Sequence, residues 1–264
     1  MQALSCPLGN ATLMAYTLRD EKKHPAVIIC PGGGYEYVSP RESTPVAMAW
    51  NRAGYNAFVL EYDCQPQPLG NLPLCQLAWA VSMVRYHAEK LNNTQQVAVA
   101  GFSAGAHLAA SLGVLWNEDK YFAGRTEAAL RRPDAMVLAY PVITAGEYAH
   151  RGSFNNLAGE EAAEQNKWSL ETLVTPDAVP AFMWHTFDDG SVLVDNTLLF
   201  SAALRKAGVQ HEVHLFPHGL HGLSLATHEI EDEVHPHLAD AHVANWFSLA
   251  AEWLTALLEN EAQC

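Results

Sequence analysis

A serine stands between small residues where an apolar run gives way to a helical pattern. Residues 101–105 read Gly-Phe-Ser-Ala-Gly, directly after the apolar run 97–100 and directly before the helix-period segment 104–116. On a sharp strand-to-helix turn a serine hydroxyl stands clear, and the helix N-terminus beneath it favours negative charge on an attacked oxygen. An ordinary turn containing Gly and Ser is the alternative, but the flanking strand and helix favour a nucleophile at Ser103.

A run of three glycines offers a place where negative charge could be stabilised. Residues 31–35 read Pro-Gly-Gly-Gly-Tyr and follow the apolar run 27–30. Backbone N–H groups can approach a substrate carbonyl only where no side chain intervenes, which would justify the entropic cost of the glycines. We expect an oxyanion hole from Gly33 and Gly34, completed by the N–H of Ala104. A flexible loop is the alternative, whereas a phosphate loop is disfavoured because no Gly-Lys-Ser/Thr follows.

A general base is predicted in residues 218–222, which read His-Gly-Leu-His-Gly after a strand pattern at 213–215. A loop beyond a late strand suits a base that must reach a serine hydroxyl. We favour His221, which stands between small neighbours, over His218, which is interpreted as a surface or supporting residue. With 13 histidines in the chain, a structural role is the ordinary interpretation of any one of them. The position of His221 in chain order is what favours it.

Two adjacent aspartates compete for the acid that would orient this base. Asp188 and Asp189 lie in the segment 185–192, again directly after an apolar run, 181–184. A buried carboxylate holds an imidazole in the required tautomer and stabilises the imidazolium. The order serine, aspartate, histidine is the α/β-hydrolase order. A turn or helix-capping role is the alternative for either aspartate, so these residues alone leave the choice open.

The elements that must position these loops are short apolar runs alternating with helix-period segments. Strands are expected at 27–30, 57–60, 97–100, 135–139, 181–184 and 213–215, and helices at 40–52, 72–91, 104–116, 196–207 and 243–258. This alternation predicts a parallel sheet covered by helices on both faces. Ligands bind beyond the carboxyl ends of such strands, which is where the four motifs lie.

Length and composition predict one domain. A chain of 264 residues that is 49% hydrophobic can bury one sizeable core, so we expect a single α/β domain over residues 1–264. Residues 145–180 interrupt the rhythm with Gly146, Gly152, Gly159 and Pro176. We interpret them as a small cap-like insertion over the site.

Charge and cysteine usage exclude several classes of protein. The net charge of −14 disfavours nucleic acid and anionic membranes as partners. No apolar stretch of ~18 residues exists to span a membrane, and the N-terminus lacks the pattern of a secretory signal, so a cytoplasmic location is expected. The five cysteines have no CxxC spacing and are expected to be free thiols.

No metal or other cofactor is expected. The histidines and glutamates between residues 228 and 242 have irregular spacing and match no H-E-x-x-H pattern. His107, just after the nucleophile, is expected to have a packed structural role. Trp246 and Trp253 in the last helix are interpreted as core or dimer-contact residues, and that apolar helix would allow a homodimer.

These motifs resemble those of an α/β-hydrolase, and more narrowly those of small bacterial esterases related to acetylxylan and feruloyl esterases. The resemblance covers nearly the whole chain and is carried by PGGGY at 31–35, GFSAGAHLAA at 101–110, HTFDDGSV at 185–192, GLHG at 219–222 and HVANWFSLAAEWL at 242–254. It implies the α/β-hydrolase fold, with a mostly parallel central sheet. Relatives commonly carry H-x-x-x-D-x-x-V around the acid. Counting from His185, the aspartate falls on Asp189 and the valine on Val192, so the resemblance favours Asp189 over Asp188.

The sequence departs from its relatives at several positions. Pro31 stands where hormone-sensitive-lipase-like cousins have histidine, Tyr62 is followed by aspartate and not arginine, Leu193 replaces a common proline, and Ala106 replaces a common glycine. None of these is a proposed reacting residue. They weaken the transfer of substrate specificity from the relatives.

Together the motifs and the resemblance predict a serine carboxylic-ester hydrolase that acts through an acyl-enzyme. The resemblance implies short, acetyl-like acyl groups on a sugar or aryl alcohol, so the expected partner is a small-molecule or saccharide ester. Tyr35 and Phe102 adjoin the two central motifs and are expected to line the acyl pocket. A peptidase of the prolyl-oligopeptidase type and a non-catalytic binding protein on the same scaffold are the alternatives.

Overall fold

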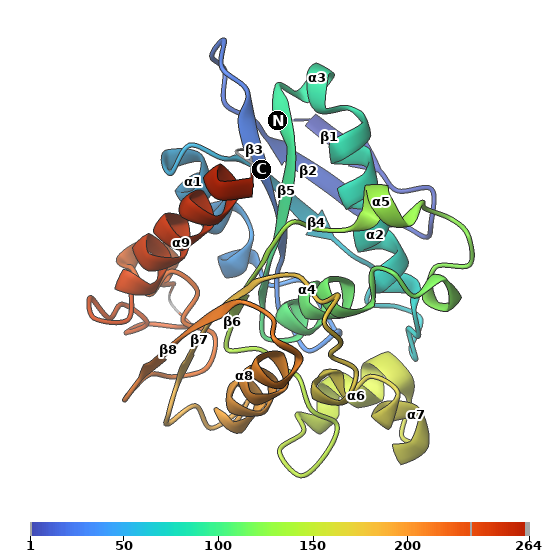
Figure 1. The fold of residues 1–264 in the computed structure, drawn as a ribbon. Helices are drawn as coiled ribbons and strands as arrows, with labels where there is room; N and C mark the ends of the chain where they lie inside the picture. Colours follow the sequence, from blue (N-terminus) through green and yellow to red (C-terminus); the bar gives the residue numbers. More distant parts are fainter. Residues whose placement is uncertain (1, 233, 262–264) are drawn as a thin grey trace.

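A twisted sheet runs through the molecule (Figure 1). The four sequence motifs that could carry chemistry each lie at or just beyond the carboxyl end of one of its strands. The computed structural model describes residues 2–232 and 234–261. Within them, eight strands lie in the order β1-β2-β4-β3-β5-β6-β7-β8. Their bounds are β1 (Gln2–Ser5), β2 (Thr12–Tyr16), β3 (His24–Cys30), β4 (Asn56–Glu61), β5 (Asn93–Phe102), β6 (Met136–Ala139), β7 (Ala181–Thr186) and β8 (His211–Phe216). The strands from β4 through β8 are parallel, and β1 and β2 add an antiparallel edge.

Helices cover both faces of the sheet (Figure 1). One face packs against α1 (Thr44–Arg52) and α9 (Asn245–Glu261). The other packs against α2 (Leu72–Tyr86), α4 (Ala104–Leu115) and α8 (Asp195–Ala207). The shorter elements are α3 (Ala88–Leu91), α5 (Ala128–Arg131), α6 (Arg151–Ala158), α7 (Ala162–Asn166), and the 3₁₀ turns η1 (Pro40–Glu42), η2 (Asp119–Tyr121), η3 (Leu170–Thr172) and η4 (His228–Ile230).

The central strand β3 illustrates why the sheet is parallel and buried on both sides. Its side chains alternate between faces, with Ile28 and Cys30 in the core beneath α2 and α4, and Val27 and Ile29 in the core beneath α1 and α9. All four are fully buried. A strand with two buried faces must be apolar at consecutive positions, which is the pattern seen in the sequence. The predicted α/β-hydrolase fold is confirmed.

The structure differs from the expected elements mainly at the sheet edge and within two helices. Strands β1 and β2 were not predicted, because they are short and lie at the edge, where one face is only partly buried. The helix expected at 40–52 is a 3₁₀ turn followed by α1, with the break at Ser43. The helix expected at 72–91 is divided at His87 and ends at Asn92, which adopts a left-handed conformation with φ 57°.

The last helix packs within its own chain. Trp246 is 1% exposed and Trp253 is 9% exposed, and both belong to the core under α9. These tryptophans therefore act as core residues and not as surface contacts. A homodimer stays a prediction.

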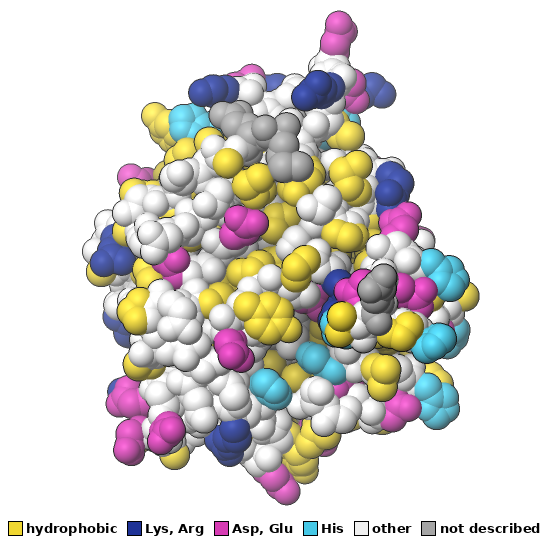
Figure 2. All heavy atoms as spheres, turned by 180° about the vertical axis from the view of Figure 1, so that it is seen from behind, with side chains coloured by type: hydrophobic (Ala, Val, Ile, Leu, Met, Phe, Trp, Pro, Cys, Tyr) yellow, Lys and Arg dark blue, Asp and Glu magenta, His cyan; other side chains and the backbone are white. Residues whose placement is uncertain are grey.

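Charged side chains are dispersed over the surface. Acidic and basic groups are interspersed on the face shown in Figure 2, with apolar side chains between them. Among the helices of the described residues, none combines the length and apolar character needed to cross a membrane. Four of the five cysteines are not in disulfides, and Cys264 lies outside the described residues.

The close contact between α4 and the end of β3 generates a first prediction. A Cβ on Gly105 would lie 2.1 Å from the carbonyl oxygen of Cys30 and 2.3 Å from that of Pro31. Backbone atoms cannot yield as a flexible side chain can, so Gly105→Ala should lower the free energy of unfolding by about 1–3 kcal/mol. Urea unfolding measures the change. Gly190→Ala is the control, because a Cβ there meets nothing within 4 Å. Equal stability of the two variants would contradict the close packing.

Candidate active site

Ser103 lies on a strained turn between β5 and α4. Its backbone has φ 51° and ψ −119°, a combination that residues other than glycine rarely adopt. The turn is tight, since a Cβ on Gly101 would lie 2.3 Å from the carbonyl oxygen of Gly105. Small residues on either side of the serine therefore permit the helix to fold back over the end of the strand.

Three loops bring a hydroxyl, an imidazole and a carboxylate into one hydrogen-bonded chain. Ser103 Oγ lies 2.8 Å from His221 Nε2, and His221 Nδ1 lies 2.7 Å from Asp189 Oδ2. The three residues follow β5, β8 and β7 respectively. The carboxyl ends of these parallel strands lie at the same edge of the sheet, which is what brings distant segments together.

The carboxylate of Asp189 is buried and held by several donors. Oδ1 accepts from the backbone N–H groups of Ser191 and Val192, at 2.9 and 3.0 Å, and Oδ2 lies 3.2 Å from His185 Nε2 in addition to His221. Burial by itself raises the pKa of Asp189, but the hydrogen bonds from His185 and His221 outweigh burial and hold the pKa well below its ordinary value. The group is thus ionised where it meets the imidazole.

The neighbouring aspartate has a different task. Asp188 is exposed, and its carboxylate accepts hydrogen bonds from His218 Nδ1 at 3.0 Å and from the N–H of Gly219 at 2.6 Å. The bond from His218 lowers the pKa of Asp188. Asp188 fixes the start of the loop that carries His221, and the structure brings Asp189, not Asp188, to that histidine.

The glycine loop forms part of the wall of the same cavity. Gly33 and Gly34 have φ +121° and +65° and line the cavity with Ser103. Their N–H groups and that of Ala104 have no hydrogen-bond partner among the described residues. The N–H of Gly32, in contrast, donates to Glu42 Oε2 at 2.7 Å. The residues predicted for an oxyanion hole therefore carry donors with no acceptor inside the described protein.

A buried network that the motifs did not indicate ties these loops together. Besides accepting from Gly32, Glu42 accepts a hydrogen bond from the Tyr140 hydroxyl at 2.6 Å, and that hydroxyl accepts one from the N–H of Ser224 at 2.9 Å. Burial and the nearby Glu42 carboxylate raise the pKa of Tyr140, so the hydroxyl keeps its proton. The Tyr140 ring lies edge-on to His221, with centroids 5.0 Å apart. The network thus connects the glycine loop to the histidine loop.

The prediction that Tyr35 and Phe102 line the acyl pocket is wrong. Both side chains are 1% exposed and neither lines the cavity. The Tyr35 hydroxyl lies 2.9 Å from His107 Nδ1 in the core. Phe102 packs on Trp246 in the core under the last helix. Adjacency along the chain misled the prediction, because neither side chain points the way the neighbouring motif does: Phe102 ends β5 with its ring in the core, and Tyr35 lies in the turn after β3 with its ring in the core on the other face of the sheet.

The cavity above Ser103 is small and polar. Its volume is about 260 Å³, and apart from the glycines its lining side chains are polar or charged, including the phenol of Tyr37 and the imidazoles of His150 and His221. Arg41 and His150 line it as well, although the motifs indicated neither residue. His150 belongs to the segment 145–180, interpreted from the sequence as a cap-like insertion.

The segment 145–180 is hydrogen-bonded to α4 and to the glycine loop. His107 is buried, and its Nε2 donates to the carbonyl oxygen of Trp168 at 2.9 Å while Nδ1 accepts from the Tyr35 hydroxyl. Asn156 Nδ2 donates to the carbonyl oxygen of Gly34 at 2.9 Å. These bonds give His107 the packed position expected for it and fix the segment 145–180 beside the glycine loop.

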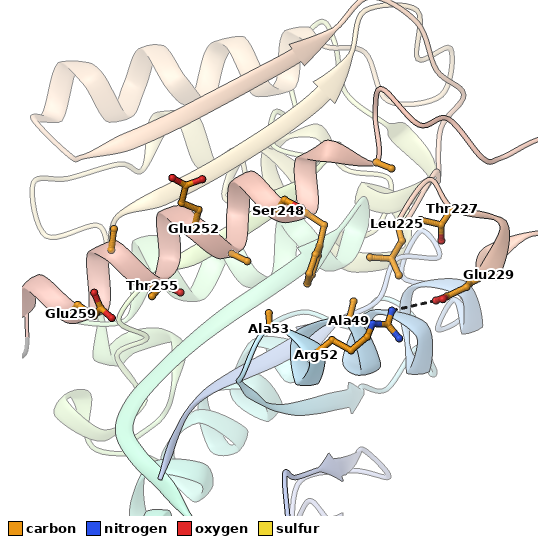
Figure 3. Close-up of a pocket in the computed structure, with 14 residues that line it drawn as sticks. Ala49, Arg52, Ala53, Leu225, Thr227, Glu229, Ser248, Glu252, Thr255 and Glu259 are labelled. Carbon is orange, nitrogen blue, oxygen red and sulfur yellow. Dashed lines mark hydrogen bonds and ion pairs between the residues drawn. The ribbon is translucent and has the colours of Figure 1, made fainter. Parts of the chain in front are cut away.

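A larger hollow lies between α1 and α9 (Figure 3). It has a volume of about 760 Å³ and shares no lining residue with the cavity at Ser103. Arg52 and Glu229 form an ion pair of 3.3 Å at its edge. Among the described residues, no histidine lines this hollow, whereas His150 and His221 line the cavity at Ser103.

The histidine-rich stretch near the last helix makes hydrogen bonds to neighbouring carboxylates at the surface. His228 lies 2.8 Å from Glu231, and His235 lies 3.0 Å from Asp232. In the part of the chain that the structure describes, no three His, Cys, Asp or Glu side chains are grouped to hold a metal ion.

Comparison with known proteins identifies the family. The BD-FAE family model matches residues 15–204, which is well over half of the chain. The chain belongs to the BD-FAE family. It has the α/β-hydrolase fold, which its carboxylesterase neighbours share, and the resemblance inferred from the motifs is confirmed.

Two curated relatives of this BD-FAE member act on xylan, according to their names. The chain is 36% identical over 223 residues to endo-1,4-beta-xylanase B of Butyrivibrio fibrisolvens. It is 28% identical over 228 residues to an acetylxylan esterase of Xylanibacter ruminicola. The matches cover 82% and 83% of this chain but 35% and 45% of those relatives, so the chain spans less than half of their length.

Solved structures show the same fold over nearly the whole chain. An acetyl ester-xyloside bifunctional hydrolase from Caldicellulosiruptor lactoaceticus is 38% identical, with a TM-score of 0.81, covering 94% of this chain and 88% of that one. A carboxylesterase from Lactobacillus plantarum is 29% identical, with a TM-score of 0.82, covering 97% of this chain and 98% of that one.

Buried His107 should make folding sensitive to mild acid. Burial lowers its pKa from 6.5 to about 4 in the folded protein. The unfolded chain therefore takes up this proton at a higher pH, and the free energy of unfolding should fall between about pH 6.5 and 4, by about 3 kcal/mol at most. Urea unfolding across this range measures it. His107→Gln should make the free energy of unfolding depend less on pH than in the wild type, whereas the exposed-site control His228→Gln should not. Equal pH dependence in all three proteins would refute the lowered pKa of His107.

Proposed function

We propose that this chain is a serine carboxylic-ester hydrolase that works through an acyl-enzyme. The observation that carries the proposal is the chain of hydrogen bonds from Ser103 Oγ through His221 to Asp189, at 2.8 and 2.7 Å. It opens onto a cavity that also contains backbone donors without acceptors. A nucleophile, a base, an orienting acid and an oxyanion site are the groups that acyl transfer requires.

In the first half of the reaction, Ser103 Oγ attacks the ester carbonyl carbon while His221 Nε2 takes the hydroxyl proton. The N–H groups of Gly33, Gly34 and Ala104 stabilise the negative oxygen of the tetrahedral intermediate. His221 then gives its proton to the departing alcohol oxygen as the carbon–oxygen bond breaks, which leaves the acyl group on Ser103.

In the second half, a water molecule replaces the alcohol. His221 takes a proton from the water as its oxygen attacks the acyl carbon, and returns a proton to Ser103 Oγ as the carboxylic acid leaves. Asp189 stays ionised throughout, and its bond to Nδ1 keeps the imidazole in the tautomer that has Nε2 free to accept.

The substrate is proposed to be a short-chain, acetyl-like ester of a sugar or aryl alcohol. A cavity of about 260 Å³ whose lining side chains are mostly polar or charged leaves little room for a long acyl chain. The names of the relatives, which include an acetylxylan esterase and an acetyl ester-xyloside hydrolase, support acetyl esters of saccharides.

Removal of the nucleophile tests the reaction type. Ser103→Ala should lower turnover of p-nitrophenyl acetate by on the order of 10⁴-fold or more, and a fluorophosphonate should label the wild type at Ser103 and leave the variant unlabelled. Ser201→Ala, a helix serine outside the cavity, is the matched control and should keep its turnover. Retained esterase activity in Ser103→Ala would refute the mechanism. Comparable turnover of a peptide amide by the wild type would favour a peptidase instead.

The two adjacent aspartates provide a matched pair of variants. Asp189→Asn should lower turnover by on the order of 10³–10⁴-fold, because the amide favours the wrong imidazole tautomer and cannot stabilise the imidazolium. Asp188→Asn should keep most of its turnover, since its carboxylate bonds only to His218 and Gly219. Steady-state kinetics on one aryl acetate suffice. A greater loss in Asp188→Asn than in Asp189→Asn would reverse the assignment.

A further inference from the structure

A second histidine faces the cavity from the insertion. His150 is the N-cap of α6, and its Nδ1 accepts a hydrogen bond from the N–H of Ser153 at 3.3 Å and lies 2.9 Å from the Ser153 hydroxyl. A neutral imidazole that accepts at one nitrogen carries its proton on the other. The cap therefore fixes the tautomer of His150 with hydrogen on Nε2.

This Nε2–H is a donor with no acceptor among the described residues. His150 is half-buried and lines the cavity together with Ser103 and His221. Burial lowers the pKa of His150, and the nearby His221 lowers it further, so the ring is neutral near pH 7. Polar groups in a partly closed cavity are ordinarily paired, and here the cavity itself is the place where a partner would bind.

The place of His150 indicates which part of an ester it can reach. Helix α6 rests on the glycine loop, because Asn156 donates to the Gly34 carbonyl oxygen and a Cβ on Gly34 would lie 3.9 Å from Ser153 Oγ. The N–H groups of that loop already serve the ester carbonyl oxygen in the proposed reaction. A short acyl group has no further acceptor, so the acceptor left for His150 is an oxygen of the alcohol part.

A second donor lines the same cavity. A Cβ on Gly222 would lie 3.4 Å from a terminal nitrogen of Arg41, so this guanidinium lies beside the His221 loop. Arg41 Nε is buried without a partner, and the guanidinium has no ion pair within the described part of the chain. Two donors without acceptors fit an alcohol that carries several oxygen atoms better than an alkyl or plain aryl alcohol.

We propose that His150 is a specificity-determining residue that donates its Nε2–H to a hydroxyl or ether oxygen on the alcohol part of the ester. This inference rests on the proposed function. It assigns the choice of alcohol to the insertion and leaves the choice of acyl group to the walls around Ser103.

Two variants with opposite side effects test this role. His150→Ser keeps a preferred N-cap residue but removes the imidazole, and His150→Phe keeps a ring of similar size but loses the cap. They share only the loss of the N–H donor. The exposed-site control is His228→Ser, which lies outside the cavity.

Two acetates are compared: an O-acetylated methyl glycoside, whose alcohol ring carries hydroxyl groups, and cyclohexyl acetate, whose ring carries none. The readout is kcat/KM for the glycoside divided by kcat/KM for cyclohexyl acetate. Loss of one hydrogen bond should lower the ratio by about tenfold in both His150 variants and leave it unchanged in His228→Ser. The role of His150 would be overturned if the ratio stayed unchanged, which includes an equal loss of kcat/KM on both acetates. It would also be overturned if the ratio fell in only one of the two His150 variants.

The same measurements distinguish a failure of the role of His150 from a failure of the proposed esterase function. If the wild type hydrolyses neither acetate, and Ser103→Ala is indistinguishable from it, the proposed function itself fails and the role of His150 falls with it. If the wild type hydrolyses both acetates and the ratio does not respond to His150, the esterase stands and only the specificity assignment is wrong.

Discussion

The turn at Ser103 is the constraint on which the rest of the structure depends. A serine with φ 51° is strained, and it persists because α4 is pressed onto the strand ends on both sides of it. Gly101 and Gly105 make this possible, since a Cβ on either would overlap backbone atoms. Once the helix start is fixed there, the hydroxyl can point only into the space above the sheet edge, where the loops after β7 and β8 must meet it.

Much of this arrangement could be predicted because its signals are local. The motif around Ser103, the glycine run at 31–35 and the apolar strands each consist of consecutive residues whose types have a direct steric meaning. The choice between Asp188 and Asp189 was different. Both aspartates follow the same strand, and the residues alone left the alternative open until the resemblance favoured the second.

What could not be predicted depends on contacts between distant residues. Glu42 meets Tyr140 across 98 positions of sequence, and Tyr140 meets Ser224 across 84. The residues around Glu42 form no local pattern that would predict a buried carboxylate hydrogen-bonded to the glycine loop. His150 was hidden in the same way, since its segment has ordinary loop composition. Phe102 shows the opposite error, in which nearness in sequence was taken for nearness in space.

The two adjacent aspartates differ in their exposure to solvent, and this difference determines what each carboxylate can do. Asp188 lies in water, where a hydrogen bond to His218 competes with solvent and contributes little. Asp189 is removed from water, which would favour its neutral form if it had no partners. The N–H groups of Ser191 and Val192 and the bond from His185 replace the lost water and keep the charge. A charge kept in a dry site acts more strongly on its neighbour than one in solvent, so the same donors that stabilise Asp189 also strengthen its hold on His221.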